Sequence, residues 1–289
     1  MSVKRLARRP IVRLDGAARL EQDDRLTLEE PLEIRLHGEA IAVVMRTPKD
    51  DFDLVAGFLL TEGIVRQPAD LGLISYCEQA QPPNLKNVIE ARLADGVEFD
   101  TQRLKRNFYA SSSCGICGKA SIDHIIAQAQ AIDTDFTVST DFLYALDGKL
   151  RQAQEVFAQT GSIHAAGLFD TEGQLLSLRE DVGRHNAVDK VIGKLVREGR
   201  RPPEKCVLMV SGRTSFEIMQ KALVAGIPMV AAVSGPSSLA VDFAREANMT
   251  LVGFLRGKRC NVYAGAERIE SPDEKQPHST EEGDSNGEK

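Results

Sequence analysis

The sequence predicts an α/β fold with a parallel sheet in its C-terminal half. Three short runs in that half are apolar throughout, and segments with helical periodicity separate them. Strands that are apolar on both faces and alternate with helices are typical of a parallel sheet covered on both sides. The predicted βαβαβ order consists of strands 207–210, 227–233 and 250–255 and helices 216–223 and 238–247.

The first half of the chain predicts a smaller mixed α/β subdomain. Thr47 and Pro48 form a helix-start signal, with Thr47 as the cap and Pro48 in the first turn. Around this signal, alternating and apolar runs indicate strands. The predicted elements are a hairpin of strands 32–36 and 40–45 with a turn at His37 and Gly38, a helix that ends at Gly63, and strands 73–77 and 87–93.

Two cysteines three residues apart, Cys114 and Cys117, lie in a Ser/Gly-rich segment. Apolar residues at helical spacing predict an amphipathic helix directly after them, from Lys119 to Asp133. Free N–H groups at a helix N-terminus and the ammonium of Lys119 favour a thiolate. A thiolate can attack sulfur, so we expect the chemistry of the protein at this pair.

Three interpretations compete for the pair: a redox disulfide, half of a zinc site, or a cysteine that carries sulfur as a persulfide. A structural zinc site needs four ligands, but Cys77, Cys206 and Cys260 are scattered singly, so no structural metal is expected. The zinc signature of nucleobase deaminases is also absent. A thioredoxin-like pair would open a helix in a βαβ unit, whereas this pair lies on a looser loop. Spacing alone does not separate the redox pair from the carrier.

Composition indicates a cytoplasmic protein. Five irregularly spaced cysteines in 289 residues do not form a secreted disulfide framework. Charged residues interrupt the segment behind Arg8 and Arg9, which therefore resembles an export signal only superficially. No apolar run approaches the roughly 20 residues that span a bilayer. We expect neither a membrane nor a nucleic acid as a partner.

Charge is concentrated at the ends of the chain. The net charge is −6, and the acidic, Ser/Gly-rich C-terminal tail carries most of it, which predicts disorder there. The first 13 residues carry five basic side chains and no acid, which indicates a solvated arm. The predicted organisation is a basic flexible arm (1–25), an N-terminal α/β subdomain (26–108), a core (109–267) and a disordered acidic tail (268–289).

Each strand of the βαβαβ run ends in a small polar loop, at 211–215, 234–238 and 256–259. Ligands of parallel sheets bind beyond the carboxyl ends of the strands, where N–H groups and helix N-termini face anions. Helix capping alone would also explain the Ser and Gly of any one loop. Three such loops together favour a phosphate-bearing ligand, and their basic residues are Arg213, Arg256, Lys258 and Arg259.

Two histidines lie in further polar segments. His164 lies in a small, apolar stretch, where a hydrogen-bonded core histidine and a functional one are equally expected. His185 follows Asp181 and Arg184 at the start of a helix predicted for 187–196, a pattern that suits anion binding or proton transfer. An ion-pair network within the fold would produce the same string.

Five ordered motifs resemble the signatures of the FdhD family, the formate dehydrogenase accessory sulfurtransferases. The resemblance runs from about residue 31 to residue 263, and five motifs in order are more specific than one CxxC. The motifs are SSCGICG (112–118), GSIHAA (161–166), EDVGRHNAVDK (180–190), SGRTSFE (211–217) and LVGF (251–254).

The resemblance implies a homodimer with a cytidine-deaminase-like core. Such a protein accepts sulfur from a cysteine desulfurase and transfers it to the molybdenum cofactor, in its bis(molybdopterin guanine dinucleotide) form, for formate dehydrogenase. Two alternatives are a chaperone that only binds this cofactor and docks formate dehydrogenase, and a thiol–disulfide oxidoreductase.

The resemblance also implies residue roles. The persulfide falls on Cys114, with Cys117 as helper, and no role falls on Cys260. The cofactor-binding stretch is Phe254, Leu255, Arg256, Gly257, Lys258 and Arg259, and the further candidates are Arg213, Ser215 and His185.

Overall fold

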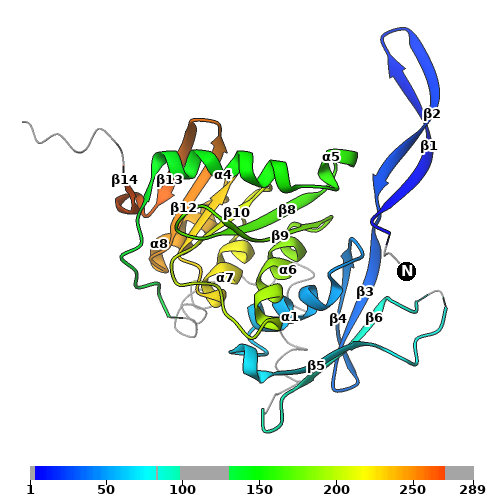
Figure 1. Ribbon diagram of the computed structural model, residues 1–289, viewed down its shortest axis with the longest axis horizontal. Helices are drawn as coiled ribbons and strands as arrows, with labels where there is room; N and C mark the ends of the chain where they lie inside the picture. Colours follow the sequence, from blue (N-terminus) through cyan, green and yellow to red (C-terminus); the bar gives the residue numbers. More distant parts are fainter. Residues whose placement is uncertain (1–3, 83, 98–129, 271–289) are drawn as a thin grey trace, which may run out of the picture.

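The computed structural model describes residues 4–82, 84–97 and 130–270, which form a mixed α/β fold (Figure 1). Its main sheet has six strands in the order β13-β12-β11-β10-β8-β9. Strands β10, β11 and β12 run parallel, which confirms the predicted βαβαβ run, while β8, β9 and β13 extend the sheet antiparallel at both sides. The strands are β8 His164–Phe169, β9 Leu175–Asp181, β10 Val207–Val210, β11 Met229–Ala232, β12 Thr250–Arg256 and β13 Arg259–Ala264.

Helices cover both faces of this sheet. Alternate strand residues face two separate cores: Leu208 and Val210 of β10 belong to the larger one, and Val207 and Met209 to the smaller. Helices α6 (Arg184–Arg197), α7 (Phe216–Ala225) and α8 (Ser238–Glu246) pack into the larger core. Helix α4 (Thr140–Ala153) covers the opposite face (Figure 1) and, with the short α5 (Phe157–Thr160), precedes β8.

A second sheet lies in the N-terminal half, with the order β4-β3-β6-β5. The predicted hairpin and both further strands are confirmed, as β3 Glu30–Leu36, β4 Glu39–Arg46, β5 Leu71–Tyr76 and β6 Val88–Leu93. Helix α1 (Asp51–Thr61) is buried along nearly its whole length and shares the larger core with α6. The N-terminal half therefore has no separate core within the described residues.

Glycines allow α1 and α6 to cross at close range. A Cβ atom built on Gly57 would lie 1.8 Å from the carbonyl oxygen of Asp189, and one on Gly193 would lie 1.8 Å from the carbonyl oxygen of Asp53. Because real Cβ atoms cannot approach so closely, this crossing requires glycine at both positions. It fixes α6, and with it His185, against the N-terminal half.

The start of α1 differs from the prediction. The helix begins at Asp51 after Asp50, which has a left-handed φ of 58°, and Thr47 is not its cap. Thr47 instead accepts a hydrogen bond from Val182 N through its hydroxyl, at 3.2 Å, and donates its own N–H to Asp181 at 3.1 Å. Tertiary hydrogen bonds thus take the groups that would have capped the helix.

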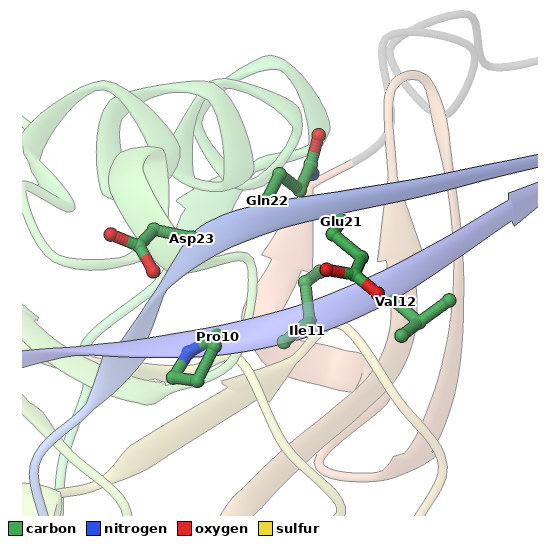
Figure 2. Close-up of a pocket in the computed structure, with 6 residues that line it drawn as sticks. All are labelled: Pro10, Ile11, Val12, Glu21, Gln22 and Asp23. Atoms are coloured by element: carbon green, nitrogen blue, oxygen red, sulfur yellow. The ribbon is translucent and has the colours of Figure 1, made fainter.

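The prediction for the N-terminal arm is also corrected by the structure. Residues predicted to be flexible form an antiparallel hairpin of β1 (Leu6–Asp15) and β2 (Ala18–Thr27), which projects from the body (Figure 1). Apolar and charged residues alternate at 12–15 and 18–21, a weak strand signal that the charge count obscures. Figure 2 shows a pocket on this hairpin, lined by Pro10, Ile11, Val12, Glu21, Gln22 and Asp23.

Two other predicted element boundaries differ from those in the structure. Residues 130–133, predicted as the last turn of the helix after the cysteine pair, are not helical, and the other residues of that predicted helix lie outside the described part of the chain. Residues 268–270, predicted as the start of the disordered tail, are ordered, because 3-10 helix η2 (Ala266–Arg268) leads into β14 (Ile269–Glu270), which pairs with β7 (Val138–Ser139). The rest of the predicted tail lies outside the described residues. The described part of the chain also includes η1 (Pro68–Asp70) and contains no helix long and apolar enough to cross a membrane.

Candidate functional site

Hydrogen bonds join the first two polar loops at the carboxyl edge of the parallel strands. The backbone N–H of Thr214 donates to the carbonyl of Gly235 at 3.3 Å, and the N–H of Ser237 donates to the carbonyl of Thr214 at 3.0 Å. The loops after β10 and β11 therefore form one surface, as predicted from their place after parallel strands.

The end of β12 completes this edge. The N–H of Phe254 donates to the carbonyl of Ser234 at 3.2 Å, and Nε of Arg256 donates to the carbonyl of Val233 at 3.4 Å. All three predicted loops thus meet, and the structure brings Arg213 to the same edge as the stretch 254–259.

The stretch 254–259 divides into exposed and buried parts. Phe254 is 46% exposed, whereas Leu255 is fully buried in the core on the α4 side. Exposed residues from Arg256 to Arg259 form the tight connection between β12 and β13, with Gly257 at a left-handed φ of 55°. Leu255 therefore anchors the strand, and its neighbours present an aromatic ring and three cations to solvent.

His185 and Ser215 form a hydrogen-bonded cluster with Glu217, a residue for which the sequence assigned no role. His185 Nε2 lies 3.2 Å from Ser215 Oγ and 3.3 Å from Glu217 Oε2, and Ser215 Oγ donates to Glu217 at 2.7 Å. The hydrogen bond with His185 is the main cause that lowers the pKa of Glu217 to about 2. The only available signal for Glu217 was its place in the SGRTSFE motif.

Positive charge gathers around His164 on β8. Burial lowers the pKa of His164 below its ordinary value, and the nearby guanidinium of Arg184 lowers it further. Asp181 raises this pKa, whereas His185 and Arg213 lower it. Within the described residues, Nε of Arg184 and Oγ1 of Thr214 are buried without a hydrogen-bond partner. Such a cationic, incompletely paired edge favours anions.

Asp181 does not contribute an open carboxylate to this edge. It is fully buried, and its Oδ2 lies 2.7 Å from Nζ of Lys190. Its Oδ1 accepts hydrogen bonds from Gly183 N at 2.8 Å and from the side-chain amide of Asn186 at 2.9 Å. Asp181 therefore belongs to an ion-pair network within the fold, which was the alternative to a role in anion binding or proton transfer. It holds the start of α6 in place.

The cysteine pair, Cys114 and Cys117, lies outside the described residues. Among the described cysteines, Cys206 is fully buried in the larger core, and this burial raises its pKa to about 12. Cys77 and Cys260 are partly buried. No group of three or more His, Cys, Asp or Glu side chains in residues 4–82, 84–97 and 130–270 is placed to hold a metal ion.

The fold and the three joined polar loops define an α/β protein with a cationic rim at the carboxyl ends of its parallel strands. The sequence profile of the FdhD/NarQ family matches residues 27–270. The chain belongs to this family, which confirms the resemblance stated from the motifs.

Named relatives support the same assignment. A protein of Streptomyces avermitilis described as "Sulfur carrier protein FdhD" is 51% identical over 267 residues, which cover 91% of this chain and 95% of that protein. A Nocardia farcinica protein of the same description is 48% identical over 275 residues, which cover 94% of this chain and 97% of the relative.

A solved structure shares the fold. It is the crystal structure of a Desulfotalea psychrophila protein, described as a candidate formate dehydrogenase accessory protein. The TM-score is 0.73 at 25% identity, and the match covers 92% of this chain and 100% of the other.

Proposed function

We propose that this protein is a sulfur carrier that takes persulfide sulfur from a cysteine desulfurase and transfers it to the molybdenum cofactor used by formate dehydrogenase. The observation that carries the proposal is the family match, which spans residues 27–270 and so includes the CxxC motif. Relatives at about half identity are named sulfur carrier proteins, which supports a sulfur-transfer role. As the resemblance implies, the protein acts in the cytoplasm as a homodimer.

In the proposed first step, the thiolate of Cys114 attacks the outer sulfur of a persulfide on the desulfurase. A new S–S bond forms at Cys114, the S–S bond of the donor breaks, and the donor cysteine leaves as a thiolate. In the second step, the thiolate of Cys117 attacks Sγ of Cys114. Sulfide then passes to the metal of the substrate, and the resulting Cys114–Cys117 disulfide is reopened by a cellular thiol reductant.

The cationic edge would hold the substrate, bis(molybdopterin guanine dinucleotide), by its phosphates. Arg213 and the turn cations Arg256, Lys258 and Arg259 offer charge-assisted hydrogen bonds to phosphate oxygens. His185 and Ser215, which lie at the N-terminal ends of α6 and α7, add polar groups on the same edge. The unpaired Arg184 and Thr214 atoms fit an edge that is completed by an anionic ligand.

The test is activation of formate dehydrogenase in cells that lack this protein. Cys114→Ala should lose nearly all activation while GDP binding is retained, and Cys117→Ser should keep sulfur loading with inefficient delivery. Cys77→Ala, which alters a partly buried thiol directly after β5 of the other sheet, is the matched control and should activate fully. Full activation by Cys114→Ala would instead support a chaperone that only binds the cofactor.

A thiol–disulfide oxidoreductase is the second enzyme candidate, because a CxxC pair can cycle between dithiol and disulfide. An oxidoreductase would reduce the disulfides of insulin, and both single variants would lose that activity equally. We expect negligible insulin reduction by the wild type. Robust reduction that disappears in Cys114→Ser and Cys117→Ser alike would overturn the carrier assignment.

A further inference from the structure

The arm formed by β1 and β2 projects from the body of the protein (Figure 1) and contributes no residue to either hydrophobic core. A two-stranded hairpin is only marginally stable in water by itself. Large apolar side chains are nevertheless exposed on this arm, and such exposed groups mark interaction sites when they gather in one place. Their exposed fractions are 73% for Leu14, 53% for Leu20, 46% for Val12 and 40% for Leu26.

The cross-strand register of the arm places charged side chains among these apolar ones. Val12 lies opposite Glu21, and Leu14 lies opposite Arg19. Because directly opposite residues of an antiparallel pair share one face, this face mixes apolar and charged groups. The interfaces of permanent complexes are largely apolar, whereas transient interfaces are about as polar as the rest of the surface. The arm therefore suits a partner that binds and then leaves.

Two arginines on the same face lack partners. Arg8 and Arg19 are exposed, and neither side chain forms an ion pair with another described residue. Since side chains alternate along a strand, Arg8 shares its face with Val12 and Leu14. Arginine is enriched at protein interfaces, and its planar guanidinium pairs readily with carboxylates. The face thus matches a protein surface that combines apolar side chains with carboxylates.

The base of the arm lies at the carboxyl edge of the parallel strands. The hydroxyl of Thr27 donates to the carbonyl of Ser162, just before β8, at 2.8 Å. At the start of β8, the carbonyl of Ala165 accepts a hydrogen bond from the N–H of Ser211 at 3.0 Å. Because Ser211 begins the polar loop after β10, the arm rises beside the edge that is proposed to hold the cofactor.

We propose that the arm is the docking surface for the protein that receives the loaded cofactor, and that it binds this protein through the face of Arg8, Val12, Leu14 and Arg19. The inference rests on the proposed function, in which the receiving protein is formate dehydrogenase. A cofactor held at this edge must pass to a protein that approaches the same edge and dissociates afterwards. Such a partner fits the mixed, partly charged face better than a second copy of the chain, which would cover the arm permanently.

The test measures the affinity of the full-length protein for purified formate dehydrogenase apoenzyme by biolayer interferometry. Leu14→Glu should weaken this binding at least about tenfold, because it places a carboxylate in an apolar contact. Arg8→Glu/Arg19→Glu should weaken it similarly, and the wild-type affinity should fall as salt rises. Leu73→Glu, at a 60%-exposed position of β5 in the other sheet, is the matched control and should bind like the wild type.

Three measurements on the arm variants separate this partner from other occupants of the arm. The variants should bind GDP, accept sulfur from the desulfurase and elute from gel filtration as the wild type does. A smaller species in gel filtration would show that a second copy covers the arm, and lost sulfur loading would show that the desulfurase binds there. Either result, or wild-type affinity for the apoenzyme in Leu14→Glu, would overturn the inference. Cys114→Ala tests the proposed function separately, because it should bind the apoenzyme normally without activating it.

Discussion

The crossing of α1 and α6 predicts a large effect of one methyl group. In Gly57→Ala, the new Cβ would lie 1.8 Å from the carbonyl oxygen of Asp189. Since an ordinary van der Waals contact needs about 3.5 Å, the two helices must separate by more than about 1.5 Å. That separation would loosen the larger core, to which both helices contribute.

Overpacking of a well-packed core costs about 1–3 kcal/mol and more in severe cases. Because a rigid backbone atom is the obstacle, we expect a loss of at least about 3 kcal/mol in the free energy of unfolding, or roughly 6–12 °C in Tm. Urea unfolding followed by circular dichroism gives the first quantity, and calorimetry gives the second.

Gly148→Ala is the matched control for this substitution. Gly148 lies in helix α4, and a Cβ atom there would meet nothing within 4 Å. Alanine should therefore stabilise the helix by about 0.5–1 kcal/mol, because it restricts the unfolded chain. A Gly57→Ala protein as stable as the wild type would refute the close crossing.

Three further perturbations test the edge and the buried pairs. Arg213→Ala and Arg259→Ala should each remove a charge-assisted contact of roughly 1.5–3 kcal/mol and so weaken GDP binding about tenfold to a hundredfold. Thermal shift with increasing GDP measures this affinity. Unchanged GDP affinity in both variants would mean that the ligand binds elsewhere. The pKa of Glu217 is lowered to about 2 from 4.5, so the stability it adds is present above pH 4.5 and is lost as pH falls towards 2. Unfolding of wild type and Glu217→Gln should therefore differ at pH 7 and converge in acid, and a pH-independent difference would contradict the contact. Lys221→Met should cost about 3–5 kcal/mol, because it leaves the buried carboxylate of Asp189, 3.0 Å from Lys221 Nζ, without its cation. The double variant Lys221→Met/Asp189→Leu should recover part of that loss in stability. If the losses of the two single variants instead add in the double variant, the two side chains do not interact.

Periodicity predicted the main elements well, because burial on both faces leaves a clear pattern. The strand 207–210 matches β10 at both ends, and the helix predicted from Phe216 begins there. The polar edge was predictable for the same reason, since the carboxyl ends of parallel strands must meet. The antiparallel strand β8 was not, because it pairs with β10, which lies about 40 residues further along the chain. Strand β13 was also missed, because the short turn that pairs it with β12 was interpreted only as a polar loop.

Features that depend on tertiary contacts escaped the sequence analysis. Thr47 reads as a helix cap, yet its hydroxyl and N–H bond to residues about 135 positions away. Asp181 reads as a functional carboxylate, but Lys190 neutralises it in the core. Local patterns carry no information on such partners. The roles of Cys114 and Cys117 and the cytidine-deaminase-like relationship stay predictions.

Mass spectrometry of the protein after incubation with a cysteine desulfurase and cysteine tests the central claim most directly. We expect one added sulfur atom that maps to Cys114, persists in Cys117→Ser and disappears in Cys114→Ala. Treatment with a thiol reductant should release it as sulfide. Sulfur that maps to Cys117 alone, or its absence from the wild type, would contradict the account.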